Sequence, residues 1–260
     1  MKAISILIPS YHSGEALQLC IESIRKKTLY TNYKIIVLDS SGEGSETREY
    51  LNQTSFIDYQ WDAPIPLRHG QALDILTRQC KTPLAVILDS DVEILRGDWL
   101  HQLTFRPIED DVMGVGFLRE GGNFLKQSFW RVPIYLPFCL LLNVDAYRKM
   151  GAKVNDWVDR YIPMSEYPYK DRFTEASYRA YHPLDSSLEK VHYDTAGGFS
   201  ERVLFENPDK LTMYPLPPAF TKDTICHYGG LSAHRKCLNS ERMQPRVARI
   251  KERLRFLRGQ

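Results

Sequence analysis

Short apolar runs alternate with helical patterns over the first third of the chain. The runs cover residues 4–8, 35–38, 56–59 and 84–88, and they recur at intervals of roughly 20 to 30 residues, the spacing of β-α-β units. Residues 35–38 and 84–88 are apolar at consecutive positions, as central parallel strands covered on both faces are. The pattern therefore predicts an α/β fold with a Rossmann-like, mostly parallel sheet flanked by helices.

Two helices are expected between these runs. The first has one apolar face at helical spacing, and Ser13 lies just ahead of it, where its hydroxyl can cap the exposed backbone N–H groups; the apolar positions are Leu17, Cys20, Ile21 and Ile24. The second opens at Gly70 and is ended by Thr82-Pro83 directly before the run at 84–88. Strand, helix, strand is the simplest arrangement.

The pattern changes beyond Leu118, where glycines and aromatic residues replace the regular alternation. We therefore divide the chain into a first half, residues 1–118, a looser second half, residues 119–240, and a C-terminal segment, residues 241–260. Positions 245–258 carry apolar residues at helical spacing, which predicts an amphipathic helix; they are Val247, Ile250, Leu254 and Leu257.

Charge is concentrated in the C-terminal segment. Residues 241–260 hold seven Arg or Lys against two Glu, a local charge of +5, whereas the whole chain carries only +2. The overall charge is too small to argue for nucleic acid as a partner. The local charge has two interpretations: peripheral contact with an anionic membrane face, at about 1 kcal/mol per basic residue, or a solvated helix that packs on its own domain through its apolar positions.

Cysteine usage and hydropathy indicate a cytoplasmic protein. The five cysteines are scattered and never form a CxxC pair, which argues against a disulfide framework. The first apolar run is too short for a signal peptide, and no run reaches the roughly 20 apolar residues that span a bilayer. We expect a cytoplasmic location, with the inner membrane face as the place of any peripheral contact.

Candidate chemistry lies at the ends of two predicted strands, which finish at Asp39 and Asp89. In open parallel sheets, ligands bind beyond the carboxyl ends of the strands, so we expect both carboxylates to face one crevice. Asp89-Ser90-Asp91 supplies two carboxylates two residues apart, which suits Mg²⁺ or Mn²⁺ completed by phosphate oxygens. The alternative is that both aspartates hold a turn or cap the helix expected near Trp99.

The order of four segments along the chain indicates which family of proteins the sequence resembles. They are Ile6-Leu7-Ile8-Pro9-Ser10-Tyr11, Val37-Leu38-Asp39-Ser40-Ser41, Arg68-His69-Gly70-Gln71-Ala72 and Leu88-Asp89-Ser90-Asp91. In this order the sequence resembles glycosyltransferase family 2, inverting enzymes of GT-A-type fold. The resemblance covers about the first 120 residues and continues weakly at 140–151, 193–195 and 227–230.

The resemblance implies a reaction and its participants. The donor would be a nucleoside-diphosphate sugar, such as a UDP-sugar, bound by residues 1–118. The acceptor would be a glycan, a glycolipid or another hydroxyl compound, bound by residues 119–240. Mn²⁺ or Mg²⁺ would assist transfer with inversion.

The resemblance also assigns donor-site residues. Pro9 and Tyr11 would shape the loop under the base, Asp39 would accept a hydrogen bond from the base or ribose, and Arg68 would meet the diphosphate or base. From the residues alone, Asp39 could equally begin a turn, and Arg68 could be a surface residue ahead of a helix.

The aspartate motif and one histidine would hold the metal. The resemblance implies that Asp89 touches the ribose or a metal-bound water, with Ser90 beside it, and that Asp91 ligates the ion directly. His227, followed by Tyr228-Gly229-Gly230, would complete the metal shell. A structural histidine is the alternative.

The general base is the weakest part of the resemblance. Family members commonly carry a Glu-Asp pair, and this chain has none on the acceptor side; Tyr193-Asp194-Thr195 is the nearest substitute. We assign Asp194 as the base, with Glu166 and Asp159 as rivals and a helix-capping role for Asp194 as the alternative.

Two further functions stay open on these residues. A sugar nucleotidyltransferase shares the layered fold and the use of metal, but it usually has a glycine-rich loop after the first strand, where this chain has Pro9-Ser10-Tyr11-His12-Ser13-Gly14. A family member that binds a nucleotide sugar without turnover would fit the missing Glu-Asp pair.

Overall fold

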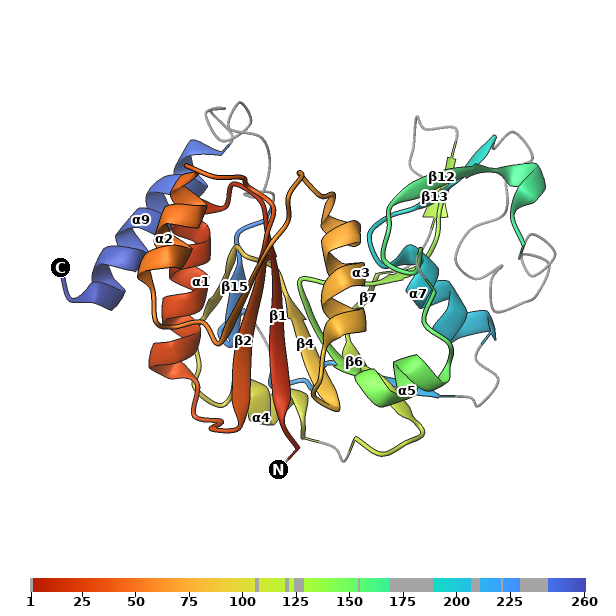
Figure 1. The fold of residues 1–260 in the computed structure, drawn as a ribbon. Coiled ribbons are helices and arrows are strands. Elements are labelled where there is room, and N and C mark those ends of the chain that lie inside the picture. The colour runs from red at the N-terminus through yellow and green to blue at the C-terminus, as the bar shows by residue number, and fades with distance from the viewer. Residues whose placement is uncertain are drawn as a thin grey trace.

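A seven-stranded sheet forms the centre of the molecule (Figure 1). The computed structural model describes residues 2–105, 108–119, 122–123, 129–153, 155–168, 189–206, 211–220, 222–229 and 243–260. The strand order is β14-β6-β11-β4-β1-β2-β3. The bounds are β1 Ile4–Ser10, β2 Tyr33–Asp39, β3 Tyr59–Asp62, β4 Leu84–Leu88, β6 Val112–Gly116, β11 Cys139–Asn143 and β14 Thr212–Pro215.

Most pairs in this sheet are parallel, as predicted. β1 pairs in parallel with β2 and β4, β2 with β3, and β14 with β6. β11 is the exception, because it lies antiparallel between β4 and β6. Strands from both predicted halves of the chain therefore share one sheet, and the division at residue 118 stays a prediction.

Helices cover both faces of the sheet. On one face lie α1 (Gly14–Lys27), α2 (Glu46–Gln53) and α4 (Trp99–Leu103), and on the other lie α3 (His69–Gln79) and α5 (Val144–Lys149). Ile6 of β1 packs in the cluster that contains α1, whereas its neighbour Leu7 packs in the cluster that contains α3. The consecutive apolar positions of the central strands thus correspond to burial on both faces, as expected.

Two local predictions are wrong. The strand expected at 56–59 is β3 at Tyr59–Asp62, because Asp58 closes the preceding turn: its N–H donates to Ile35 O (2.9 Å) and its carboxylate accepts from Ile35 N (2.7 Å). Ser13 does occupy the N-cap position of α1, but its hydroxyl does not cap the helix. Instead it lies 2.7 Å from the hydroxyl of Ser90 in a buried contact.

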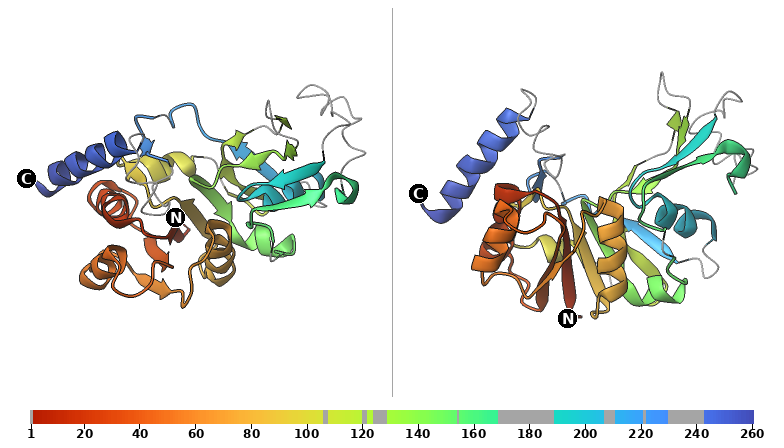
Figure 2. Two further views of the ribbon diagram at one scale, coloured as in Figure 1. Left: turned by 90° about the horizontal axis from the view of Figure 1, so that it is seen from above. Right: turned by 45° about the horizontal axis from the view of Figure 1, so that its top comes forward.

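A second layer of short strands lies beside the main sheet (Figure 2). One sheet has the order β12-β13-β9-β8, and the strand pair β10-β7 accompanies it. The strand pair β15-β5 lies apart from this layer and packs against α1 at the main sheet. The bounds are β5 Val92–Ile94, β7 Leu118–Arg119, β8 Gly122–Asn123, β9 Phe129–Arg131, β10 Ile134–Tyr135, β12 Arg160–Pro163, β13 Lys190–Tyr193 and β15 Ile225–His227. Three short helical elements complete this layer: η1 Met164–Glu166, α7 Gly197–Glu201 and the π-helical η3 Arg202–Glu206.

Gly70 lets the two layers meet closely. A Cβ atom at this first-turn position of α3 would lie 2.0 Å from the backbone oxygen of Trp157 and 2.8 Å from Val158 Cα. Only glycine leaves room for that backbone. The start of α3 is thereby fixed against the segment that carries Asp159.

The C-terminal helix α9 (Gln244–Arg258) packs against α1 (Figures 1 and 2). Ile250 and Leu254 are buried there with Ala16 and Leu19 of α1. This arrangement confirms the helix and agrees with the interpretation that its apolar positions pack on its own domain. In the described ranges, no helix is both long and apolar enough to cross a membrane.

Candidate functional site

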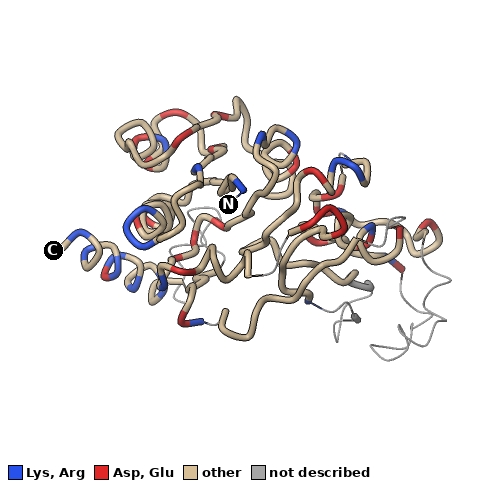
Figure 3. The backbone as a smooth tube through the Cα atoms, turned by 90° about the horizontal axis from the view of Figure 1, so that it is seen from below, with Lys and Arg blue, Asp and Glu red and all other residues tan. Residues whose placement is uncertain are grey.

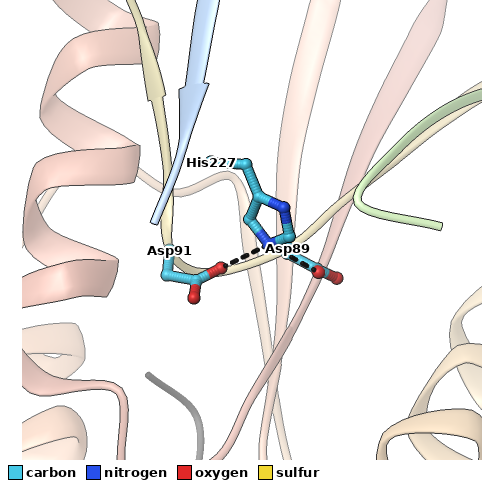
Figure 4. A group of neighbouring side chains, drawn as sticks. All are labelled: Asp89, Asp91 and His227. Carbon is cyan, nitrogen blue, oxygen red and sulfur yellow. Dashed lines mark ion pairs between the residues drawn. The ribbon is translucent and has the colours of Figure 1, made fainter. Parts of the chain in front are cut away.

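Asp89, Asp91 and His227 form a compact cluster at the carboxyl end of β4 (Figure 4). Asp89 directly follows β4, and Asp91 precedes β5 after a tight turn in which Val92 N donates to Asp89 O (3.2 Å). His227 ends β15, which pairs with β5 so that His227 lies opposite Val92. The antiparallel β15-β5 pair therefore brings a distant histidine to the predicted carboxylates.

The geometry of the cluster suits a cation. His227 Nε2 lies 3.3 Å from Asp89 Oδ2 and 3.2 Å from Asp91 Oδ1, and one ligand atom from each residue lies within 4.8 Å of the others. The ring of Phe138 stacks on His227 at a centroid distance of 4.8 Å and fixes the imidazole plane. Two carboxylates and one imidazole are a donor set that Mn²⁺ accepts.

One carboxylate oxygen of this cluster lacks a hydrogen bond from the described residues. Asp89 Oδ1 is buried and accepts no well-aligned hydrogen bond from the described residues, although His69 Nε2 lies 3.2 Å away. A buried carboxylate oxygen without a hydrogen bond is unfavourable unless a cation compensates it. The residues present therefore fit a divalent ion.

Charge compensation governs the protonation of the cluster. Burial alone would raise the pKa of Asp89, but the charge of His69 and the charge and hydrogen bond of His227 outweigh it and hold the pKa below its usual range. Burial would likewise lower the pKa of His227, but its hydrogen bonds to Asp89 and Asp91 raise it to about 9. The two aspartates thus attract one positive charge, which a metal ion would supply in place of the proton.

A cavity of about 490 Å³ adjoins the cluster. Its wall combines the end of β1, the start of α3 and the segments around Asp159 and Asp194. His69 connects the two features, because it lines the cavity and also contacts Asp89. The hydroxyl oxygen of Ser10, another lining residue, is buried and makes no hydrogen bond within the part of the chain that is described.

The structure brings four of the predicted residues together on this wall: Pro9, Tyr11, Arg68 and Asp194. Asp159, a rival for the base, also lines the cavity and lies 3.8 Å from Arg68, measured between Oδ2 and Nη1. Glu166, the other rival, is an exposed residue at the end of η1 and is not part of the wall.

Asp39 and Ser90 are placed differently from the prediction. The carboxylate of Asp39 is fully buried and accepts hydrogen bonds from Arg48 Nε (2.9 Å) and the Ser41 hydroxyl (2.6 Å). Ser90 is buried against Ser13. Neither side chain lines the cavity, so the structure does not place Asp39 and Asp89 on one crevice wall. Their donor-site roles stay predictions.

Asp194 is held firmly at the cavity wall. Its Oδ2 accepts a hydrogen bond from Arg119 Nη2 (2.9 Å), and its Oδ1 accepts one from Thr195 N (2.9 Å). The side chain remains about one-third exposed. A carboxylate that is oriented in this way and still reachable can accept a proton from a bound hydroxyl.

His69 is the site residue that sequence reasoning missed. It stands next to Arg68 in the third of the four segments, so the resemblance placed it near the donor without assigning it a role. The signal available in the sequence was its place between Arg68 and the predicted start of the helix at Gly70. In the structure, it is the first residue of α3 and contacts Asp89 at the end of β4.

Glu201 is the last residue of α7, the helix that follows Asp194 in the chain. It is 1% exposed and accepts a hydrogen bond from the hydroxyl of Tyr167. Burial raises the pKa of Glu201 from 4.5 to about 7, although hydrogen bonds from Tyr167 and Tyr193 act in the opposite direction. The folded protein therefore binds a proton here more tightly than the unfolded chain does.

We expect Glu201 to make stability fall as the pH rises. The unfolded carboxyl ionises near pH 4.5 and the folded one near pH 7. The free energy of unfolding of the parent, taken relative to that of Glu201→Gln, should therefore be roughly 3 kcal/mol lower above pH 7 than below pH 4.5. Urea unfolding of both proteins across this range measures the difference. A constant difference would contradict the raised pKa.

Comparison with known proteins gives one family and several partial relatives. Residues 5–154 match the family model described as Glycosyl transferase family 2, which is more than half of the 260 residues. A stretch of 104 residues is 27% identical to an uncharacterized protein, y4gI, of Sinorhizobium fredii (strain NBRC 101917 / NGR234) and covers 38% of this chain and 11% of that protein. A stretch of 184 residues is 22% identical to the O-antigen biosynthesis protein RfbC of Myxococcus xanthus and covers 57% of this chain and 14% of that protein.

The chain thus spans a small part of the curated relatives it matches. Among solved structures, it is similar to the mannosyltransferase PcManGT from Pyrobaculum calidifontis in complex with GDP-Man and Mn²⁺. That match has 15% identity and a TM-score of 0.46, and it covers 58% of this chain and 47% of that chain.

Proposed function

This chain belongs to glycosyl transferase family 2, and we propose that it is a glycosyltransferase that moves a sugar from a nucleoside-diphosphate donor to an acceptor hydroxyl. We further propose that Mn²⁺ or Mg²⁺ assists the transfer and that the anomeric centre is inverted. The observation that carries this proposal is the Asp89–Asp91–His227 cluster adjoining the 490 Å³ cavity.

The site residues divide the proposed reaction between them. Asp91, Asp89 and His227 would hold the divalent ion, which would act as a Lewis acid on the diphosphate and offset the charge that develops there. Arg68 would bind polar groups of the donor in the cavity. Asp194 would take the proton of the acceptor hydroxyl.

A single displacement of the leaving group at the anomeric carbon inverts the configuration of that carbon. The base must then approach from the side of the sugar opposite the leaving group. Asp194 lines the cavity from the second layer, whereas His69 and the metal cluster lie at the end of β4. A donor sugar bound between them would meet the base and the leaving group from different sides, which supports a single displacement.

We propose a glycan or a glycolipid as the acceptor. A relative named for O-antigen biosynthesis supports a glycan or glycolipid acceptor rather than a small alcohol. Such an acceptor would be compatible with a cytoplasmic enzyme that works at the inner membrane face. Peripheral contact through α9 stays a prediction.

Donor binding and hydrolysis across a panel of nucleotide sugars test the proposed function. We expect one class of donor to be bound and slowly hydrolysed with Mn²⁺ or Mg²⁺, and EDTA to abolish the hydrolysis. Indifference to every nucleotide sugar, with or without metal, would sink the proposal. Hydrolysis that EDTA leaves unchanged would remove the role of the metal alone.

A second function has one observation in its favour. Both oxygens of Asp194 already accept hydrogen bonds, from Arg119 and from Thr195, so a structural role at the cavity wall also explains this carboxylate. A chain that binds a nucleotide sugar without transferring it would have the same cavity. In the panel above, tight donor binding without any hydrolysis or transfer identifies that case.

A further inference from the structure

A buried glutamate stands two residues after the proposed metal ligand Asp91. Glu93 lies in β5 and is 1% exposed. A buried carboxylate is costly unless charged and hydrogen-bonding partners compensate it. Glu93 has such partners on both oxygens: Arg253 Nη2 and Nε lie 2.7 and 2.9 Å from Oε1, and the Tyr228 hydroxyl donates to Oε2 at 2.9 Å.

These partners come from the residue that follows β15 and from α9. Tyr228 directly follows His227 of β15, and its N–H donates to the backbone oxygen of Asp91 (3.1 Å). Arg253 belongs to the C-terminal helix α9. Glu93 therefore connects the strand that follows Asp91, the strand that ends in His227, and α9.

Two more arginines of α9 contact the same segment. The guanidinium of Arg249 lies 5.7 Å from the ring centroid of Tyr228, and Arg246 donates to the backbone oxygen of Gly229. Residues 246, 249 and 253 share one side of a helix by their spacing. Much of the positive charge of α9 (Figure 3) is thus directed at the residues that follow His227.

Other basic residues of α9 hold the helix on α1 instead. Arg258 Nη2 lies 2.7 Å from Glu22 Oε1, and Lys251 lies 3.5 Å from Glu15. Among the described residues, neither pair makes a hydrogen bond or ion pair with β5 or β15. Arg253 and Arg258 therefore make similar ion pairs from the same helix to different elements. Replacing each arginine in turn distinguishes a loss of α9 anchoring from an effect on the metal cluster.

We propose that Arg253 is a positioning residue for the metal cluster and acts through Glu93 and Tyr228. In this proposal, α9 helps to set the geometry of the metal cluster in addition to packing on α1. Without Arg253, the buried Glu93 carboxylate keeps only the Tyr228 hydroxyl as a donor among the described residues, and it turns toward water. That movement loosens the β15-β5 pair, and His227 shifts relative to Asp91. The part of this inference that concerns metal rests on the proposed function.

Affinity for Mn²⁺, followed by electron paramagnetic resonance of the free ion, tests the inference on the full chain. Arg253→Met should weaken Mn²⁺ binding about 10-fold, because groups that orient metal ligands typically contribute 10- to 100-fold to affinity. Arg258→Met should bind Mn²⁺ like the parent, although it removes an ion pair of the same kind. Tyr228→Phe, which removes one hydrogen bond and keeps the ring, should weaken binding by a smaller factor.

Equal Mn²⁺ affinity in the parent, Arg253→Met and Tyr228→Phe would overturn the inference, and so would an equal loss in Arg258→Met. Should Arg253→Met fail to fold, Tyr228→Phe alone decides between these outcomes.

Amide hydrogen exchange of the metal-free proteins separates this inference from the proposed function. The Tyr228 N–H should lose protection in Arg253→Met and keep it in Arg258→Met. If the parent binds no Mn²⁺, the metal-assisted function fails, and the exchange of Tyr228 still supports or overturns the connection between Arg253 and the cluster.

Discussion

Replacement of Asp194 with Asn should lower kcat for sugar transfer by about 10²–10⁴, the usual contribution of a positioned general base. Asn has nearly the same shape, and its amide oxygen can keep the hydrogen bond from Arg119, but it cannot accept the acceptor proton. Donor affinity should stay within a few fold of the parent, since the proposed metal ligands and the α3 side of the cavity are untouched. Transfer kinetics and donor titration on the same preparation measure the two effects.

The rival carboxylates provide matched controls. Asp159→Asn changes a residue on the same cavity wall and near Arg68, so it should affect donor or acceptor binding more than kcat. Glu166→Gln changes an exposed residue away from the cavity and should behave like the parent. If the large loss of kcat appears in Asp159→Asn instead, Asp159 is the base and Asp194 is a structural carboxylate.

The central sheet could be predicted because its signal is local. Each residue of β4 is buried, and successive residues such as Val86 and Ile87 pack in clusters on opposite faces. Burial on both faces requires consecutive apolar residues, and that requirement is visible in the sequence. The same local signal placed Asp89 and Asp91 at the end of a buried strand.

His227 could be placed only through the resemblance. It reaches the aspartates because β15 pairs with β5, and a short strand such as Ile225–His227 carries too little pattern to predict its partner. Once the pairing exists, the register fixes His227 opposite Val92.

The partners of buried charged groups could not be predicted. Asp39 ends β2 as expected, but its carboxylate pairs with Arg48, a residue of α2 that the sequence does not distinguish from other surface arginines. Glu93 and Arg253 likewise lie far apart in the chain. Which cation meets a buried carboxylate depends on how helices dock on the sheet, and that docking is set by tertiary packing rather than by local pattern.

The segment that forms the second wall of the cavity depends on one such pair. Asp156 is 2% exposed, and its Oδ2 accepts hydrogen bonds from Arg202 Nη1 (2.6 Å), the Tyr147 hydroxyl (3.0 Å) and Lys153 N (3.0 Å). Its backbone oxygen accepts from Phe199 N (2.8 Å) at the start of α7. Asp156 thus ties the segment before Asp159 to the helix after Asp194.

Asp156→Ala should therefore reduce the free energy of unfolding by about 3–5 kcal/mol, since it leaves the 8% exposed side chain of Arg202 buried without its closest carboxylate. Among the described residues, Glu206 and the backbone oxygen of Met150 then remain as its partners. The double change Asp156→Leu with Arg202→Met should restore part of that loss, because apolar side chains need no compensating charge. Urea unfolding of the parent, the single and the double variant measures both effects. A double variant less stable than Asp156→Ala would show that the hydrogen bonds from Tyr147 and Lys153, rather than the charge of Arg202, make Asp156 necessary.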